Sequence, residues 1–128
     1  MTTFRAPCAL ALSLFILLAA SAPAQAANLR RGLYDCVGTA SGYVASVKIK
    51  ADGEYLYANA RKRSKLTNPT KGSYKLSGKK IAWRSGTFKR SGYVSTIYTT
   101  ASSPKGYFSL DRKSNGTWTG ISCYWLAG

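Results

Sequence analysis

The sequence predicts an all-β protein with about eight short antiparallel strands in a meander that closes, or nearly closes, into a small barrel. Nine Tyr and three Trp accompany many Thr, Val and Ile, which are the residue types favoured in sheets. Gly and Ser interrupt them about every 8–12 residues, as in sandwiches and barrels. No window after the first 26 residues keeps a helical hydrophobic period. A sandwich of two sheets also fits these observations.

The strands are placed by their aromatic and β-branched content and by the alternation of apolar and polar side chains. They cover residues 33–37, 43–50, 55–59, 73–76, 80–84, 93–100, 107–112 and 117–126. The second alternates most clearly, and we expect Tyr43, Ala45, Val47 and Ile49 to face the core. Loops are expected at 61–71, 85–91 and 101–105.

Turn signals connect the strands. Asp52-Gly53 predicts a tight turn, and Asn115-Gly116 predicts a two-residue hairpin before the last strand. Several strands start with a Gly-x-Tyr element such as Gly72-Ser73-Tyr74. We interpret its Gly as leaving a turn and its Tyr as starting a strand.

The first 26 residues predict a secretion signal. Arg5 gives the segment a positive head, residues 9–20 are apolar except for Ser13, and small residues lead to a cleavage site after Ala26. A membrane anchor is the alternative, but a spanning helix needs roughly 20 apolar residues, and this run is too short. We expect residues 27–128 to form a single domain that is secreted or periplasmic, with no transmembrane segment.

Two cysteines remain after the signal. In an oxidising compartment an isolated pair such as Cys36 and Cys123 usually forms a disulfide. The two residues belong to the first and last expected strands, which are neighbours in a closed barrel. Two free buried thiols are the alternative.

The charge balance points to anionic partners. The chain has 19 Lys and Arg against four Asp and Glu, and loss of Arg5 with the signal leaves 18 − 4 = +14. Self-repulsion on this scale disfavours the compact state, which favours a function for the charge. The alternative is a basic surface that only promotes solubility and binds no partner.

The residue inventory argues against catalysis. The chain has no His, which excludes Ser-His-Asp and Cys-His arrangements and His-ligated metal sites. Four acids are too few for a convincing calcium cage, and no pair of carboxylates is placed by the sequence for glycosidic cleavage. We expect no enzyme activity, no metal and no cofactor.

A basic run between residues 61 and 90 contains no acid. On the expected topology Lys75, Lys80 and Arg84 share the outer face of one hairpin, and the flanking loops add further cations. Such a surface attracts phosphate, sulfate and carboxylate groups. The predicted anion-binding residues are Arg61, Lys62, Arg63, Lys65, Lys75, Lys80, Arg84, Lys89 and Arg90.

Short motifs resemble a loose, largely uncharacterised class of small secreted bacterial β domains. They are Gly32-Leu33-Tyr34-Asp35-Cys36, Gly72-Ser73-Tyr74, Ile81-Ala82-Trp83-Arg84-Ser85-Gly86 and a late cysteine, Cys123. The resemblance spans most of residues 27–128. It implies the β fold and the disulfide, and it supplies no catalytic residues.

The expected function is that of a non-catalytic binding module with a basic face for an envelope polymer, an acidic glycan or an anionic lipid. Nucleic acid is a possible partner but is not favoured, because exposed aromatics among the basic residues would be needed and only Phe88, Tyr93 and Tyr98 are candidates. The alternatives are a protein-binding factor, such as an inhibitor or a host-interaction protein, and a barrel that holds a small apolar ligand. The sequence leaves the oligomeric state open.

Overall fold

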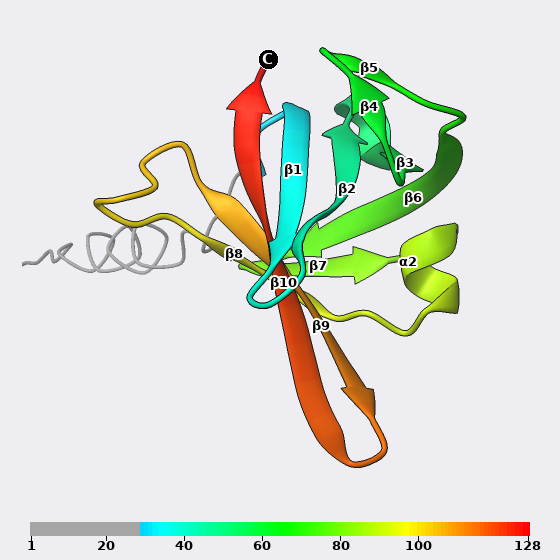
Figure 1. Cartoon of the computed structure of the whole chain (residues 1–128), viewed down its shortest axis with the longest axis vertical. Helices are drawn as coiled ribbons and strands as arrows, with labels where there is room; N and C mark the ends of the chain where they lie inside the picture. Colours follow the sequence, from blue (N-terminus) through cyan, green and yellow to red (C-terminus); the bar gives the residue numbers. More distant parts are fainter. Residues whose placement is uncertain (1–28) are drawn as a thin grey trace, which may run out of the picture.

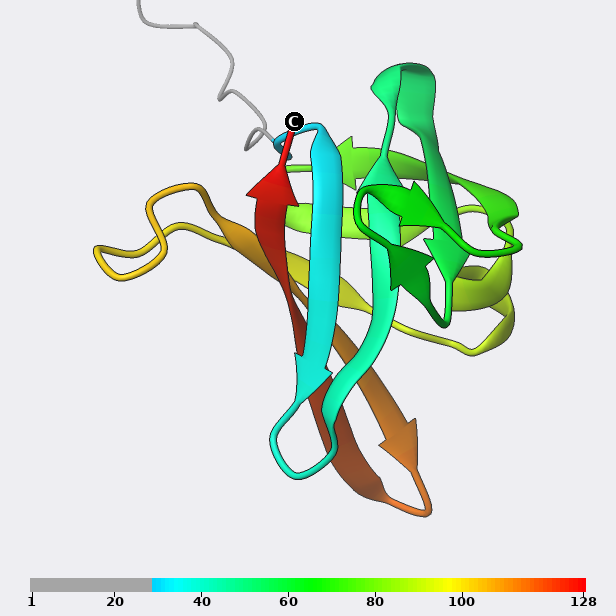
Figure 2. The same cartoon turned by 45° about the horizontal axis from the view of Figure 1, so that its top comes forward.

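The computed structural model describes residues 29–128, which form one closed barrel of eight antiparallel strands (Figures 1 and 2). The predicted signal peptide, residues 1–26, lies outside the described residues. The strand order around the barrel is β1-β10-β9-β8-β7-β6-β3-β2. The predicted meander and its closure into a barrel are therefore confirmed, and the two-sheet sandwich is not formed.

Each of the eight expected strands is present. The barrel strands are β1 (Gly32–Gly38), β2 (Gly42–Ile49), β3 (Glu54–Ala58), β6 (Thr70–Ser77), β7 (Lys80–Trp83), β8 (Ser95–Tyr98), β9 (Tyr107–Ser114) and β10 (Thr117–Ala127). The Asn115-Gly116 turn joins β9 to β10 with φ of 52° and 79°, the positive values that this dipeptide favours. The β9–β10 hairpin extends well beyond the barrel (Figures 1 and 2).

Two of the expected loops contain secondary structure. The segment 61–71 holds a small hairpin of β4 (Arg61–Lys62) and β5 (Lys65–Leu66), and the segment 85–91 holds the short helix α2 (Thr87–Arg90). A short 3-10 turn, η2 (Ala51–Gly53), joins β2 to β3. The β4–β5 hairpin packs on the outside of the barrel, where Leu66 is buried with residues of β1 and β3.

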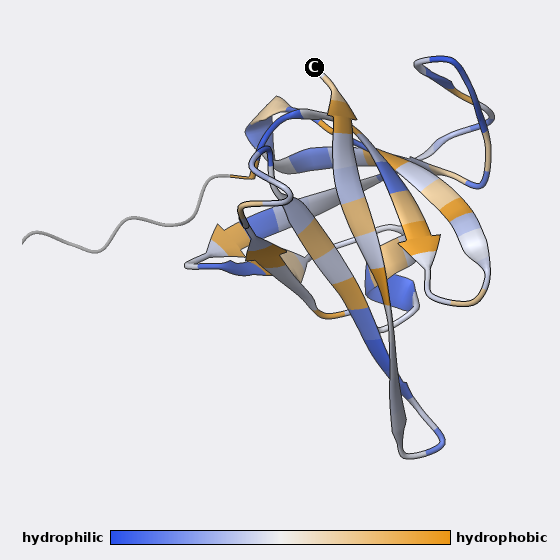
Figure 3. Ribbon diagram, turned by 60° about the vertical axis from the view of Figure 1, so that its left-hand side comes forward, coloured by the Kyte–Doolittle hydropathy of each residue, from blue (hydrophilic) through white to orange (hydrophobic). Residues whose placement is uncertain are grey.

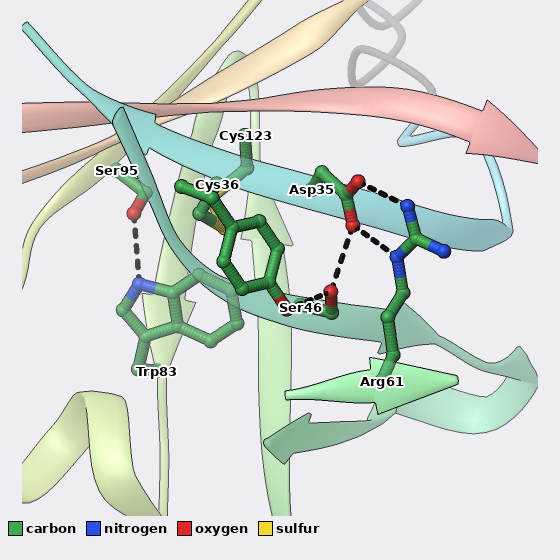
Figure 4. The surroundings of a disulfide bond; sticks show 8 residues. Asp35, Cys36, Ser46, Arg61, Trp83, Ser95 and Cys123 are labelled. Atoms are coloured by element: carbon green, nitrogen blue, oxygen red, sulfur yellow. Dashed lines mark hydrogen bonds and ion pairs between the residues drawn. A yellow bond between two sulfur atoms is a disulfide. The ribbon is translucent and has the colours of Figure 1, made fainter. Parts of the chain in front are cut away.

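The disulfide closes the barrel. Cys36 on β1 and Cys123 on β10 lie directly opposite each other in the strand register, and their sulfurs are bonded (Figure 4). Both residues are fully buried. The predicted pairing of the first and last strands through this bridge is confirmed.

Aromatic side chains fill the barrel interior. Trp83 lies at the centre of the group, with ring centroids 4.9 Å from Tyr55, 4.7 Å from Phe88 and 5.9 Å from Phe108. Its indole nitrogen donates a hydrogen bond to the buried Ser95 hydroxyl at 2.9 Å. Apolar and polar residues alternate in colour along several of the strands (Figure 3).

One residue expected in the core lies outside it. Tyr43 is 45% exposed, whereas Ala45, Val47 and Ile49 are buried as predicted. The reason is a register shift: Cys36 pairs with Ala45, but Val37 pairs with Tyr43, so Val44 is an extra residue on β2. A bulge of this kind reverses the inward-outward alternation on one side of it.

Gly72 corrects our interpretation of the Gly-x-Tyr element. It lies inside β6 and is buried, instead of leaving a turn. A Cβ at this position would lie about 2.4 Å from the Tyr55 ring, so the glycine makes room for that ring.

Candidate anion-binding surface

Positive charge is concentrated on one half of the barrel. The strands β2, β3, β6 and β7 are consecutive around it, and their outward side chains and strand ends carry cations that are all exposed to solvent. We call this surface the cationic wall. Its members are Lys48, Lys50, Lys71, Lys75, Lys80 and Arg84.

The register shows how these side chains come together. Leu56 on β3 is paired with Lys48 on one side and with Lys71 on the other, so the two lysines lie in one row across three strands. Neighbouring strands are about 4.8 Å apart, which separates the two backbone positions by about 10 Å. Lys75 pairs with Ala82, and Lys80 pairs with Ser77, on the adjoining hairpin.

Glu54 is the only acidic residue in these four strands. Its carboxylate lies 3.9 Å from Lys50 Nζ and 3.8 Å from Lys71 Nζ. Exposed pairs at this separation are weak and screened by salt. The cationic wall therefore keeps a large excess of positive charge.

The opposite half of the barrel contains few basic residues. The strands β1, β10, β9 and β8 are also consecutive, and residues 32–38, 95–98, 107–111 and 120–127 contain no Lys or Arg. Arg112 and Lys113 lie farther along β9, in the extended hairpin. The strand order thus separates a cationic half of the barrel from a half in which these segments carry no cation, and their charged side chains are Asp35 and Asp111.

The predicted anion-binding residues fall into three groups. Lys75, Lys80 and Arg84 share the outer face of the β6–β7 hairpin, as expected, and belong to the cationic wall. Lys62, Arg63 and Lys65 are exposed on the β4–β5 hairpin. Lys89 and Arg90 are exposed on α2, outside the strands of the wall.

Arg61 has a different role from the one expected. Its Nε donates to Asp35 Oδ1 at 2.7 Å, and its Nη2 donates to Asp35 Oδ2 at 2.6 Å (Figure 4). Its Nη1 donates to the Arg63 carbonyl at 2.6 Å. Because this guanidinium is engaged within the protein, we assign Arg61 to the attachment of the β4–β5 hairpin and exclude it from the candidate surface.

The contact with Arg61 changes the pKa of Asp35. The hydrogen bonds from Arg61 lower the pKa of its carboxyl below the usual value. Partial burial opposes this shift, and a further hydrogen bond at 2.7 Å from the Ser46 hydroxyl adds to it. The carboxylate is therefore held in its charged form by its partners.

Three members of the cationic wall were not among the predicted site residues: Lys48, Lys50 and Lys71. Lys48 and Lys50 alternate with the apolar residues of β2, a signal that places them outward. The sequence does not tell which strand lies beside β2. Only the pairing of β3 with both β2 and β6 brings these lysines next to the basic run.

The aromatic candidates for stacking on bases are not placed among the cations. Phe88 is buried at 1% exposure and stacks on Tyr55 with a centroid distance of 5.0 Å, so this candidate is not available to a base. Tyr93 is half-buried against the core. Tyr98 is exposed but lies on β8, outside the four strands of the cationic wall.

The barrel interior offers limited room for a ligand. An enclosed cavity beside Phe88 measures about 80 Å³ and is lined partly by Tyr57, Tyr93 and Leu110. A ligand pocket is typically about 300 Å³ or more. A larger cavity of about 260 Å³ is lined partly by the core residues Tyr34 and Ile97, so the barrel that holds a small apolar molecule stays an alternative.

Among residues 29–128, no three His, Cys, Asp or Glu side chains come together as a set that could hold a metal ion. The helices described in this part of the chain include none of the length and apolarity required to cross a bilayer. Comparisons with protein-family models, with curated proteins and with solved structures find no match for this chain.

Proposed function

We propose that the protein is an exported, non-catalytic binding module whose cationic wall contacts anionic polymers or surfaces, such as an envelope polymer, an acidic glycan or an anionic lipid. The observation that carries the proposal is the separation of charge between the two halves of the barrel. A basic surface that served solubility alone would not need six of its cations gathered on four neighbouring strands.

The chemistry of the wall suits a repeating anion. Its cations are exposed ammonium groups and one guanidinium, spread over strands whose pairing sets the spacing between them. Lysine contacts phosphate or sulfate as a point charge, without demanding one geometry. We therefore expect binding that depends on the charge density of the partner more than on its sequence or sugar identity.

Export follows from the predicted signal and agrees with the disulfide, since such bonds persist in oxidising compartments. An exported protein with this surface meets anionic polymers and lipid head groups on cell envelopes. The anionic groups of such partners are the common feature that the cationic wall would recognise.

The proposal is tested with residues 27–128 on immobilised heparin and on phosphatidylglycerol vesicles, at low and high salt. We expect retention on both, and a steep loss of binding as salt screens the charges. The variant Lys71→Ser/Lys75→Ser/Lys80→Ser should lower affinity at low salt by about tenfold or more, because three neighbouring contacts are removed.

The matched control is Lys105→Ser/Arg112→Ser/Lys113→Ser, which removes the same charge away from the wall. It should change affinity only by a small factor. Equal losses in the two variants would show that net charge, and not the wall, attracts the partner. Binding that is indifferent to salt would favour the protein-binding alternative instead.

A further inference from the structure

A pocket opens at the end of the barrel where β1 begins and β8 ends. It measures about 260 Å³ and lies between the segment before β1 and the loop 99–106, which joins β8 to β9. The loop projects from the barrel (Figures 1 and 2). We call this hollow the end pocket. No residue of the cationic wall lines it, so it is a separate feature of the molecule.

The deep side of the end pocket is apolar. Tyr34 is 1% exposed and Ile97 is 6% exposed, and both belong to the barrel core. Leu29 packs against the same core, while Pro104 and Tyr107 add further apolar surface to the lining. An apolar group that entered the pocket would therefore be removed from water, which favours binding.

Two cations lie at the mouth of the end pocket. Arg30 and Lys105 both line it and are exposed to solvent. The guanidinium carbon of Arg30 and the ammonium nitrogen of Lys105 each lie 4.9 Å from the centre of the Trp125 ring. One indole ring thus brings together two cations that are far apart in the sequence.

These two positive charges are not balanced by the protein. The ion pairs formed within residues 29–128 involve Lys50, Arg61 and Lys71, and neither cation at the pocket takes part in one. An aromatic ring attracts a cation, but it carries no net charge and leaves the positive charge in place. The mouth of the end pocket therefore offers an uncompensated pair of cations above an apolar lining.

The segment that carries Arg30 is attached to the barrel by two hydrogen bonds. The Tyr34 hydroxyl donates to the Arg30 carbonyl at 2.6 Å, and the Trp125 indole nitrogen donates to the Arg31 carbonyl at 2.9 Å. These contacts fix the backbone of the segment beside the pocket. A group that is already positioned loses less conformational freedom when a ligand binds.

We propose that the end pocket binds a small amphipathic anion, a carboxylate with an aliphatic or aromatic body. The carboxylate would contact Arg30 and Lys105, and the body would lie against Tyr34 and Ile97. A guanidinium matches the two oxygens of a carboxylate. A purely apolar ligand would make no use of the two charges, and an anion without an apolar body would make no use of the lining.

The size of the pocket sets the size of the ligand. Its volume of about 260 Å³ lies just below the usual range of ligand pockets, which begins at about 300 Å³. A small molecule fits, whereas the length of a polymer does not. This proposal is therefore independent of polymer binding by the cationic wall, and either can fail without the other.

The experiment is an NMR titration of isotope-labelled residues 27–128 with octanoate. Acetate, which lacks the apolar body, and octanol, which lacks the charge, are titrated in parallel. We expect octanoate to bind about tenfold more tightly than either, because only octanoate uses both parts of the pocket. The amide signals of Tyr34, Ile97 and Lys105 should shift. Equal affinities for octanoate and octanol would overturn the proposal, as would shifts confined to the cationic wall.

The variant Arg30→Ser/Lys105→Ser removes both cations at the mouth. It should weaken octanoate binding by about tenfold or more and leave octanol binding unchanged. The matched control is Arg112→Ser/Lys113→Ser, which removes one Arg and one Lys from the distant β9–β10 hairpin and should change octanoate affinity only by a small factor. The NMR spectrum of each variant establishes that it is folded. Equal losses in the two variants would overturn the assignment, because net charge alone would then attract octanoate.

The variant Thr99→Trp tests the location independently of charge. Thr99 is exposed and lines the end pocket, so a larger ring at this position should block octanoate. The control Ser102→Trp places the same ring at a second hollow, also of about 260 Å³, which shares Lys105 with the end pocket but is not lined by Thr99. Octanoate binding should persist in this control. Unchanged binding in Thr99→Trp, or loss of binding in Ser102→Trp, would overturn the assignment.

Discussion

Close contact between a glycine and an aromatic ring shapes the barrel at the scale of single residues. Gly72 on β6 lies under the Tyr55 ring, and Gly86 closes the same space from the segment before α2. The Tyr55 hydroxyl donates to the Ser85 carbonyl at 2.9 Å and accepts from the Phe88 amide at 3.1 Å. One buried tyrosine thus connects β3 to α2, and the glycines give it room.

The substitution Gly72→Ala tests this contact. The added methyl would lie about 2.4 Å from atoms of the Tyr55 ring, closer than real contacts allow. Forced overpacking of this kind typically costs about 1–3 kcal/mol, and we expect the upper part of that range because the ring is held at both ends. The free energy of unfolding in urea measures it, with Gly78→Ala as the control, since no atom lies within 4 Å of the Cβ that this change would add. Gly78 has a φ of 59°, so some loss from strain is expected in the control, and Gly72→Ala must exceed it.

At the scale of elements, the β4–β5 hairpin is attached to the barrel by both apolar and charged contacts. Leu66 packs with Leu33 and Ala58, while Arg61 forms two hydrogen bonds with Asp35 on β1. A hairpin of two-residue strands is not stable alone. The attachment to the barrel therefore decides where its exposed cations are held.

The Asp35 contact predicts a dependence on pH. Because the pKa of Asp35 is lowered in the folded state, its contribution to stability is complete above the unfolded value of about 4 and is lost as pH falls through the folded value. We expect Asp35→Asn to lower the urea midpoint at pH 6, where the partner guanidinium loses its carboxylate. The difference from the parent protein should shrink as the pH approaches 2.

The control for this prediction is Asp52→Asn. It removes an exposed carboxylate from the η2 turn, where Asn also tolerates the φ of 63°. Its effect at pH 6 should be small. If the two variants behave alike between pH 6 and pH 2, the hydrogen bonds of Arg61 do not contribute as argued.

The helix α2, also at the scale of elements, contributes one buried side chain to the barrel core. It has only four residues, yet Phe88 places a ring among Tyr55, Tyr57, Trp83 and Tyr93. The flanking Lys89 and Arg90 stay exposed because the helix buries just this one side chain. The helix therefore forms part of the core, and it adds no cation to the cationic wall.

At the scale of the whole molecule, closure of the barrel opposes the repulsion among its cations. The first and last strands pair along six positions, and the Cys36–Cys123 bridge lies in the middle of that pairing. The bridge links residues 87 positions apart, so it strongly restricts the unfolded chain. Residues 29–128, with 18 basic and four acidic side chains, gain from such a constraint, since repulsion between like charges favours expansion.

Reduction of the disulfide should lower the free energy of unfolding by about 4 kcal/mol, the value that chain-entropy models give for a loop of this size. Urea denaturation with and without a reductant measures the change. The variant Cys36→Ala/Cys123→Ala is the control and should be insensitive to the reductant. Coincident unfolding curves for oxidised and reduced protein would contradict the expectation.

Much of the fold could be predicted from local signals in the sequence. Alternation placed the strands, and Asn115-Gly116 placed a hairpin turn, because both depend on neighbours in the sequence. Three features could not be predicted, because each depends on a partner distant in the chain. They are the bulge at Val44, the burial of Gly72 under the Tyr55 ring and the burial of Phe88 in the barrel core. The same limit explains why Arg61 was assigned to the candidate site although Asp35 engages it.

The sequence by itself determined the strand pattern, the excess of positive charge and the cysteine pair, since these follow from composition and local periodicity. Only the tertiary structure decided how charge is distributed. Lysines from β2 and β6 become neighbours through β3, while β1, β10, β9 and β8, whose only cations are Arg112 and Lys113 at the end of β9, become consecutive on the other half. The physical reason is that hydrogen bonding around a closed barrel sets which strands are adjacent, and side chains can act together only across that adjacency.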